Sequence, residues 1–336
     1  MFRYGGDTLL PTTEGFVMFP EYRDSQHHWE LTDGMNAIAL WLKSYMIDVK
    51  LSESGRATQQ IIQTLGGFNG VRNIANSGVV ELLNDLSKKP IAKNMQQHEF
   101  INRVNAKVKG DIWLEGSAEQ LVKRNAVELG LEIKCSKCSS WSWYSLNQLN
   151  YKINCGLCLR EFGFPVINPS GRESSRWAYR LIGPFALPDY ASGGYAASLA
   201  IRFFSEIIGY HNSKITWSSG QELTFQNGNK IEADFILWYQ RTQIFGLDHP
   251  TEIVFGEAKS FGKIVFKDDD IMRMKHLAEA FPGAVLVFAT MKEASELTSD
   301  ERSNRPSVAM RLKETRWQSL LKKRITRLIM WLNCVS

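Results

Sequence analysis

The stretch EIVFGEAKSFGK at residues 252–263 decides the fold of this chain and points to its chemistry. Its apolar beginning predicts a buried strand, yet the run ends on Glu257 and Lys259, two residues apart. Side chains two apart on a strand lie on the same face, so these two charges are neighbours. Because charges at the end of a buried run cost free energy unless something uses them, the stretch marks a candidate site.

The elements around this strand predict an α/β sheet protein, or more broadly an α+β chain of several domains. In order, the patterns predict a helix over 192–209 opened by Ser192 and closed by Gly209, a strand over 215–225, a turn at Asn227-Gly228, a strand over 230–240, the strand 252–260, a helix over 268–281 and an apolar strand over 284–290. The order helix, three strands, helix, strand belongs to the α/β class.

A second carboxylate lies on the strand before EIVFGEAKS. Alternation along 230–240 puts Asp234 on one face with Glu232, and pairing of the two strands would bring Asp234 to Glu257, with Lys259 beside them. Two hard carboxylates bind Mg²⁺ and leave positions for water and a phosphate oxygen, while a nearby lysine orients that water or stabilises transition-state charge. This constellation predicts phosphodiester hydrolysis.

A Glu-x-Lys triplet alone is weak support, because about one is expected by chance in a chain of this length. A second copy is Glu132-Ile133-Lys134, with Asp111 upstream. A helix predicted over 117–130, capped by Ser117 and ended by Gly130, separates Asp111 from Glu132, so no shared sheet is expected there.

Residues from about 190 to 290 resemble the PD-(D/E)XK nuclease superfamily, which has the restriction-endonuclease-like fold with a helix, three-stranded meander, helix, strand core. The matching residues are Asp234 in IEAD, where Ala233 replaces the family's proline, and Glu257 and Lys259 in GEAKS. The resemblance implies that Asp234, Glu257 and the backbone carbonyl of Ala258 bind Mg²⁺ or Mn²⁺, and that Lys259 is the catalytic lysine.

Many members add an acidic residue from the first helix, and Glu206 is the candidate; pairing with Arg202 on a solvated helix face is the alternative. Other charges carry weaker cases. Glu222 and Glu232 are further acidic candidates, Asp268 to Asp270 fit the acidic first turn of a helix, and Arg273, Lys275 and His276 suit either phosphate contacts or an exposed helix face.

Four of the five cysteines follow the spacing C-x2-C-x16-C-x2-C, at Cys135, Cys138, Cys155 and Cys158. Two such turns predict a tetrahedral Zn²⁺ site like that of a zinc ribbon, and four thiolate ligands leave no position open for catalysis. Two disulfides would require an oxidising compartment. The aromatic residues between the pairs either stack with nucleic acid, beside nearby lysines, or form the ribbon's own core. They are Trp141, Trp143 and Tyr144, with Lys134, Lys137 and Lys152.

The chain divides by pattern into four regions. These are a mostly helical region over 1–112, a zinc ribbon with a leading helix over 113–168, a nuclease-like domain over 169–295 and a basic segment over 296–336 with an amphipathic helix at 310–332. The helical region rests on patterns at 35–49, 57–68 and 78–88, and His27 and His28 within it are expected to be surface residues. The C-terminal helix either lies along DNA or packs its apolar face on the preceding domain.

Charge and hydropathy bound the class of protein. The net charge is +5, but residues 301–336 hold nine Lys or Arg and two Glu, so the rest of the chain sums to −2. No run of eighteen apolar residues exists, and MFRYGGDT lacks the features of a signal peptide. A cytoplasmic protein without a membrane partner is therefore expected.

The residue pattern predicts metal-assisted phosphodiester hydrolysis. The resemblance to the PD-(D/E)XK superfamily implies a metal-dependent endonuclease acting on nucleic acid, with DNA as the expected substrate, and by analogy a setting such as prokaryotic defence, DNA repair or a mobile element. A protein partner or a homodimer would supply recognition. Two alternatives stay open: a catalytically inactive nucleic-acid-binding or scaffold protein, and a zinc-ribbon regulatory protein in which the charged set is an incidental salt-bridge cluster.

Overall fold

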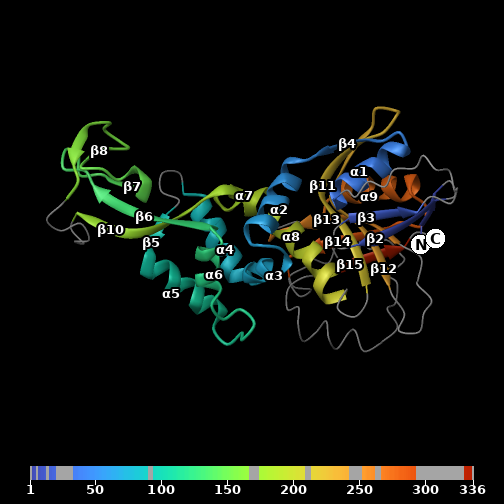
Figure 1. The fold of residues 1–336 in the computed structure, drawn as a ribbon, viewed down its shortest axis with the longest axis horizontal. Helices are drawn as coiled ribbons and strands as arrows, with labels where there is room; N and C mark the ends of the chain where they lie inside the picture. The colour runs from blue at the N-terminus through green and yellow to red at the C-terminus, as the bar shows by residue number, and fades with distance from the viewer. Residues whose placement is uncertain are drawn as a thin grey trace. The chain divides into compact units, whose positions relative to one another are not determined.

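A computed structural model describes most of the chain, namely residues 2–4, 7–12, 15–19, 33–89, 94–165, 174–208, 213–241, 252–261, 266–292 and 329–334. The chain forms two compact units, each drawn in Figure 1. Unit 1 combines Met1–Gln59 with Gly193–Ser336, and unit 2 is Gln60–Ser192. Both units mix helices with sheets, which confirms the broad α+β class.

Unit 1 is built on a six-stranded sheet with the order β15-β14-β13-β12-β11-β4. The strands are β4 (Asp48–Leu51), β11 (Ser213–Thr224), β12 (Lys230–Arg241), β13 (Glu252–Lys259), β14 (Val285–Thr290) and β15 (Ile329–Cys334). Neighbouring strands are antiparallel except β13 and β14, which are parallel. Parallel neighbours need a crossover, and α9 (Asp268–Ala280) provides it.

The predicted strand and helix positions within this sheet agree closely with the structure. The β11–β12 turn uses the predicted pair: Gly228 has a φ of 80°, which suits glycine, and the Asn227 side chain accepts a hydrogen bond from the amide of Asn229. The predicted helix over 192–209 is α8 (Gly194–Arg202), which continues as a π-helical segment, η4 (Phe203–Ile208). It begins after Gly193 instead of at Ser192, and residue 209 lies outside the described residues.

Helices cover both faces of this sheet. On one face, α1 (Gly34–Ser44) and α9 pack on the strands through buried apolar residues. Trp41 lies 5.0 Å from the Trp238 ring centre, and Phe255 lies 5.0 Å from that of Phe281. On the other face, α8 and η4 pack on the strands, with Phe204 near Phe235. Both faces of the sheet are thus covered by helices and shielded from water, which accounts for the continuous apolar runs of β13 and β14.

The prediction of a mostly helical region over 1–112 is correct for α1, α2 (Glu53–Thr64), α4 (Ser77–Ser87) and α5 (Gln97–Val108), but wrong for the first residues. β1 (Phe2–Tyr4), β2 (Asp7–Thr12) and β3 (Gly15–Phe19) form an antiparallel sheet of their own. The sequence pattern does not predict β4 either. This short segment is a strand because it pairs with β11, which lies far along the chain. His27 and His28 lie outside the described residues.

Unit 2 combines helices with a four-stranded sheet in the order β5-β10-β6-β7. These strands are β5 (Asn94–Gln96), β6 (Val127–Lys134), β7 (Trp141–Ser145) and β10 (Ser175–Leu181). A separate hairpin holds β8 (Lys152–Asn154) and β9 (Glu161–Gly163), and short helices α3 (Phe68–Val71) and α7 (Pro188–Ser192) complete the unit. The boundary predicted near residue 168 lies outside the described residues.

The helix predicted over 117–130 is wrong in its second half. α6 covers Ser117–Lys123 only, its N-cap residue is Gly116, and Gly130 lies in the middle of β6 instead of ending a helix. The segment becomes a strand because β7 and β10 pair with it on both sides. Glycine is needed at position 130 because a Cβ there would lie only 2.5 Å from the ring of Trp143.

The amphipathic helix predicted over 310–332 is wrong at its C-terminal end. Residues 329–334 form β15, which pairs with β14 from Thr290 opposite Ile329 to Val285 opposite Cys334. Backbone pairing with the open edge of β14 outweighs the helical spacing of the apolar residues. The remainder of the predicted helix lies outside the described residues.

Candidate functional site

The three residues predicted from GEAKS and IEAD meet where the β12–β13 ladder ends. Phe235 opposite Gly256 is the last pair at this end of the ladder, and the next residues along the two strands are Asp234 and Glu257. The amide of Ala258 donates a 2.7 Å hydrogen bond to Oδ2 of Asp234. Nζ of Lys259 lies 2.5 Å from Oε1 of Glu257.

Helix α9 adds two residues to this cluster. Asp270 Oδ1 lies 3.3 Å from Nζ of Lys259, and Arg273 Nη2 lies 3.1 Å from Oε1 of Glu257. Arg273 also bonds Asp270 directly. We refer to Asp234, Glu257, Lys259, Asp270 and Arg273 as the carboxylate cluster.

The sequence pattern places Asp270 only in the acidic first turn of the helix, and it fits Arg273 either to a phosphate contact or to an exposed helix face. Asp270 does serve that turn, since its Oδ2 accepts a hydrogen bond from the amide of Lys267. Its Oδ1 meanwhile faces Lys259. The i,i+3 spacing of Asp270 and Arg273 was the available signal, whereas Lys275 and His276 are exposed.

Burial sets the electrostatics of the cluster. Glu257 is 2% exposed and Asp270 is 6% exposed. Burial raises the pKa of Asp234 to about 6, although the Ala258 amide and the Lys259 cation oppose the rise. Burial and the neighbouring Asp234 carboxylate raise the pKa of Glu257 to about 8, against the pull of Lys259 and Arg273. Asp234 and Glu257 therefore release their protons closer to neutral pH than ordinary carboxylic acids do.

The two cations respond in the opposite sense to the carboxylates around them. Burial alone would lower the pKa of Lys259, but Glu257, Asp234 and Asp270 outweigh it and raise that pKa above its ordinary value. Lys259 is thus a fixed ammonium held between two carboxylates. Such an ammonium donates hydrogen bonds and stabilises negative charge, and it does not act as a base.

The other acidic candidates serve different purposes or stay unplaced. Glu206 lies in η4, and its side chain falls outside the described part of the structure. Oε1 of Glu232 accepts a 3.0 Å hydrogen bond from Ser54 and so links β12 to α2. Glu222 forms an exposed ion pair with Lys230 across the β11–β12 hairpin.

In the second Glu-x-Lys triplet, Glu132 has a structural role and shares no site with Asp111. Glu132 is buried and bonds the side chains of Asn94 and Arg176. Lys134 is exposed two residues further along β6. Asp111 accepts a hydrogen bond from the amide of Trp113 in a local turn.

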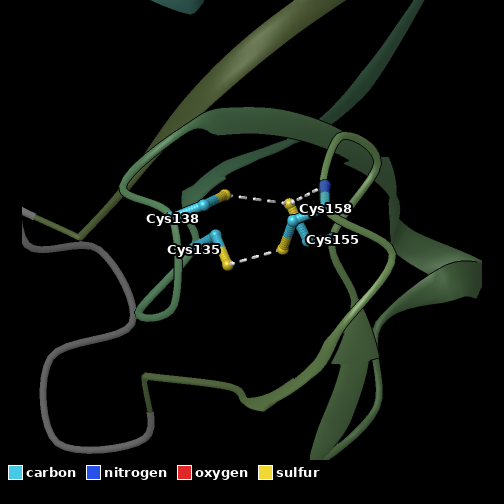
Figure 2. Close-up of side chains that lie close together, drawn as sticks. All are labelled: Cys135, Cys138, Cys155 and Cys158. Atoms are coloured by element: carbon cyan, nitrogen blue, oxygen red, sulfur yellow. Dashed lines mark hydrogen bonds between the residues drawn. The ribbon is translucent and has the colours of Figure 1, made fainter.

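The four paired cysteines form the second candidate site. Figure 2 shows their side chains pointing toward one another from two loops, and their sulfur atoms all lie within 4.8 Å of one another. Cys135 and Cys158 sulfurs are 3.9 Å apart, and those of Cys138 and Cys155 are 3.6 Å apart. Sulfurs bound about 2.3 Å from one zinc ion in a tetrahedron lie about 3.8 Å apart, whereas a disulfide bond measures about 2.05 Å. These four cysteines could therefore hold a metal ion such as zinc.

The loops around the cysteines favour the thiolate form at Cys138 and Cys155. Burial and the neighbouring sulfurs raise the pKa of Cys158 to about 11, although a backbone hydrogen bond from Arg160 opposes the rise. The amides of Lys137 and Leu157 donate hydrogen bonds to the sulfurs of Cys135 and Cys155. Ser140 and nearby amides lower the pKa of Cys155 to about 5. Since the thiolate is the form that binds metals, this environment suits a metal centre.

A small apolar core supports the four-cysteine cluster. It contains Leu131, Ile133, Tyr144, Ile153 and Phe162 with the buried Cys135 and Cys155. The Tyr144 hydroxyl donates a 2.9 Å hydrogen bond to the carbonyl of Asn154. Of the three aromatic residues whose role was left open, Tyr144 therefore belongs to the core.

Comparisons with protein-family models, curated proteins and solved structures find no match for this chain. Among the described residues, no helix has the length and apolar character needed to cross a membrane.

Proposed function

We propose that this protein is a metal-dependent nuclease of the PD-(D/E)XK superfamily that hydrolyses phosphodiester bonds, with DNA as its substrate. The observation that carries the proposal is the meeting of Asp234, Glu257 and Lys259 at one end of the β12–β13 ladder. The chain order α8, β11, β12, β13, α9, β14 supports it, because it agrees with the helix, three-stranded meander, helix, strand order of that superfamily.

The proposed metal ligands are Asp234, Glu257 and the backbone carbonyl of Ala258, which offer the hard oxygen donors that Mg²⁺ or Mn²⁺ takes. Charge balance supports a cation there. The three carboxylates of the cluster exceed its two cations by one. Burial raises the pKa of Asp234 and Glu257, so ionising both carboxylates is costly unless a cation lies beside them. When bound, the cation supplies Lewis acidity and lowers the pKa of a coordinated water.

Lys259 is the residue of this chain that would act on the reacting phosphate. Its ammonium is charged, partly exposed and held by Glu257 and Asp270, so it can orient a water or stabilise negative charge on the phosphate in the transition state. Asp270 gives Lys259 a second carboxylate partner. That partner keeps the ammonium in place when oxygens of Glu257 serve a cation.

The test is cleavage of plasmid and linear DNA by purified wild-type protein with Mg²⁺, with Mn²⁺ and without divalent cation. We expect cleavage only with a divalent cation, and loss of at least about a hundredfold in rate for Lys259→Ala, as for removal of a single transition-state donor. Lys275→Ala is the matched control, since Lys275 lies on α9 but is exposed. Identical behaviour of wild type and Lys259→Ala under every metal would refute the proposal.

The four-cysteine centre is proposed to hold one structural Zn²⁺. Its sulfur separations suit tetrahedral coordination, and four protein thiolates leave no ligand position for a substrate. Its role is to hold the short β8–β9 hairpin against β6 and β7.

A further inference from the structure

The four-stranded sheet of unit 2 has two unlike faces. One face carries Leu131, Ile133 and Tyr144, which form the core beside the four cysteines. Strand register places a different set on the opposite face, where β10, β6 and β7 run side by side. We call this set the arginine–tryptophan face; it consists of Lys134, Trp141, Trp143, Arg176 and Arg180, with Glu128 and Glu132 between them.

Each tryptophan of this face stacks with an arginine. The guanidinium of Arg176 lies 4.5 Å from the ring centre of Trp141, and that of Arg180 lies 5.3 Å from the ring centre of Trp143. Stacking holds a guanidinium flat by attraction to the ring face and leaves its in-plane N–H groups free to donate. Two arginines are thereby held with their donors already oriented.

The support under Trp143 is specific. Its ring lies over Gly130, where a Cβ would come within 2.5 Å of it, and its Nε1 donates a 3.2 Å hydrogen bond to the carbonyl of Ala178. The ring therefore reaches across β6 to β10 and is fixed at both ends. A fixed ring fixes Arg180, which is otherwise exposed.

Some charged side chains of this face have an ion-pair partner among the described residues and others do not. Glu132 is buried and is neutralised by Arg176. Lys134 and Arg180 are exposed, and within the described ranges no carboxylate forms an ion pair with either, Glu128 included. The exposed Lys137, three residues after Lys134 in the first cysteine loop, likewise has no ion-pair partner among the residues that the structure describes. Oriented guanidinium donors beside unpaired ammonium groups complement a chain of phosphates.

We propose that the arginine–tryptophan face binds the sugar–phosphate backbone of DNA without reading its sequence, and so holds substrate for the nuclease. The inference rests on the proposed function for the identity of its partner, but not for its residues. Arg180 and Lys134 supply the main phosphate contacts. Arg176 is partly committed to Glu132, and the tryptophans act by positioning the arginines.

The test measures DNA binding by the full chain carrying Lys259→Ala, which keeps the DNA intact. Fluorescence anisotropy with a labelled duplex, and with a single strand of the same sequence, is recorded over a series of salt concentrations. For Arg180→Gln with Lys134→Gln we expect Kd to rise on the order of tenfold at about 0.1 M salt. The slope of log K against log salt should fall by about 1.8 on duplex, or about 1.4 on the single strand, as for two lost phosphate contacts.

The control variant removes two positive charges of unit 2 that are already paired. Lys152 pairs with Glu161 and Arg103 pairs with Glu99, so Lys152→Gln with Arg103→Gln should leave the salt slope unchanged. Arg180→Lys with Lys134→Arg retains the charges and should retain the slope. Unfolding midpoints and zinc content verify that every variant is folded.

Three outcomes overturn the proposal: unchanged Kd and slope in the Arg180→Gln, Lys134→Gln protein, an equal loss in the control, or absence of DNA binding by the parent. Failure of the nuclease is seen separately. If wild type cuts DNA in a metal-dependent way and the face variants bind DNA as the parent does, only the proposal of a DNA-binding face is refuted. Binding that depends on the face, without cutting under any metal, removes only the nuclease.

Discussion

The backbone amide of Ala258 donates its hydrogen bond to Oδ2 of Asp234, so one carboxylate both closes the end of the β12–β13 ladder and belongs to the carboxylate cluster.

Two substitutions of Asp234 distinguish its role in stability from its role in cleavage. Asp234→Asn keeps an acceptor for the amide but loses the charge, so we expect near wild-type stability without cleavage. Asp234→Ala loses both, and should also be destabilised by about 1–3 kcal/mol through the unpaired buried amide. Urea unfolding and plasmid cleavage measure the two effects; equal destabilisation by both variants would contradict this assignment.

Arg273 neutralises buried Glu257 and Asp270 from α9. Arg273→Gln should lower the free energy of unfolding by about 1–2 kcal/mol in Mg²⁺-free buffer. This is less than for a fully buried pair, because about a third of the Arg273 side chain is exposed. Added Mg²⁺ should recover more stability in this variant than in wild type, since a cation at the cluster replaces the lost charge. Lys275→Gln is the control, and a Mg²⁺ response equal to that of wild type would count against a shared site.

The raised pKa of Glu257 predicts a specific pH dependence. Between its ordinary value near 4.5 and about 8, the folded protein holds a proton on Glu257 that the unfolded chain has lost. Stability from this group is therefore present at pH 5 and is lost as pH rises through 8, at up to about 1.4 kcal/mol per pH unit. Glu257→Gln should flatten this dependence. Thermal unfolding of both proteins from pH 5 to 8 without divalent cation is the measurement. A chelator must be left out because it would also remove zinc, and parallel curves for the two proteins would exclude the shift.

Metal analysis of freshly purified protein should find one zinc per chain, and Cys155→Ser should remove it. Without the metal, we expect amides of the three-residue strands β8 and β9 to lose protection from hydrogen exchange, because these strands are short and the apolar core that they join is small. Amides of β13 and β14 in unit 1 should stay protected. Cys334→Ser changes a cysteine outside the cluster and should keep the metal. Zinc well below one per chain in wild type would refute the site.

Local sequence patterns predict the centre of the unit 1 sheet because each of its elements has a recognisable apolar spacing within a short stretch. β12, α9 and β14 combine a clear apolar spacing with turn or acidic first-turn residues, and Asp234, Glu257 and Lys259 follow from strand alternation. The edges of the sheet were not predictable in this way. β4 and β15 are strands because they pair with β11 and β14, which lie far away in sequence. The apolar spacing of either segment does not indicate which strand it pairs with.

The contribution of α9 to the site has the same origin. Which side of α9 faces the cluster depends on how the helix crosses from β13 to β14, so Asp270 and Arg273 read from sequence as ordinary helix charges. Likewise Gly130 resembles a helix end in the sequence, and the close approach of the Tyr144 carbonyl and the Trp143 ring explains the glycine as part of a strand.

Unit 2 is continuous in sequence, whereas unit 1 is interrupted by it. During synthesis from the N-terminus, residues 60–192 are complete before the ribosome has made β11, the strand with which β4 must pair. Unit 2 can therefore fold first and bind the metal proposed for its four cysteines, while β4 is still unpaired. The carboxylate cluster forms only after β13 and α9 have emerged, so the chain acquires its proposed cutting centre last.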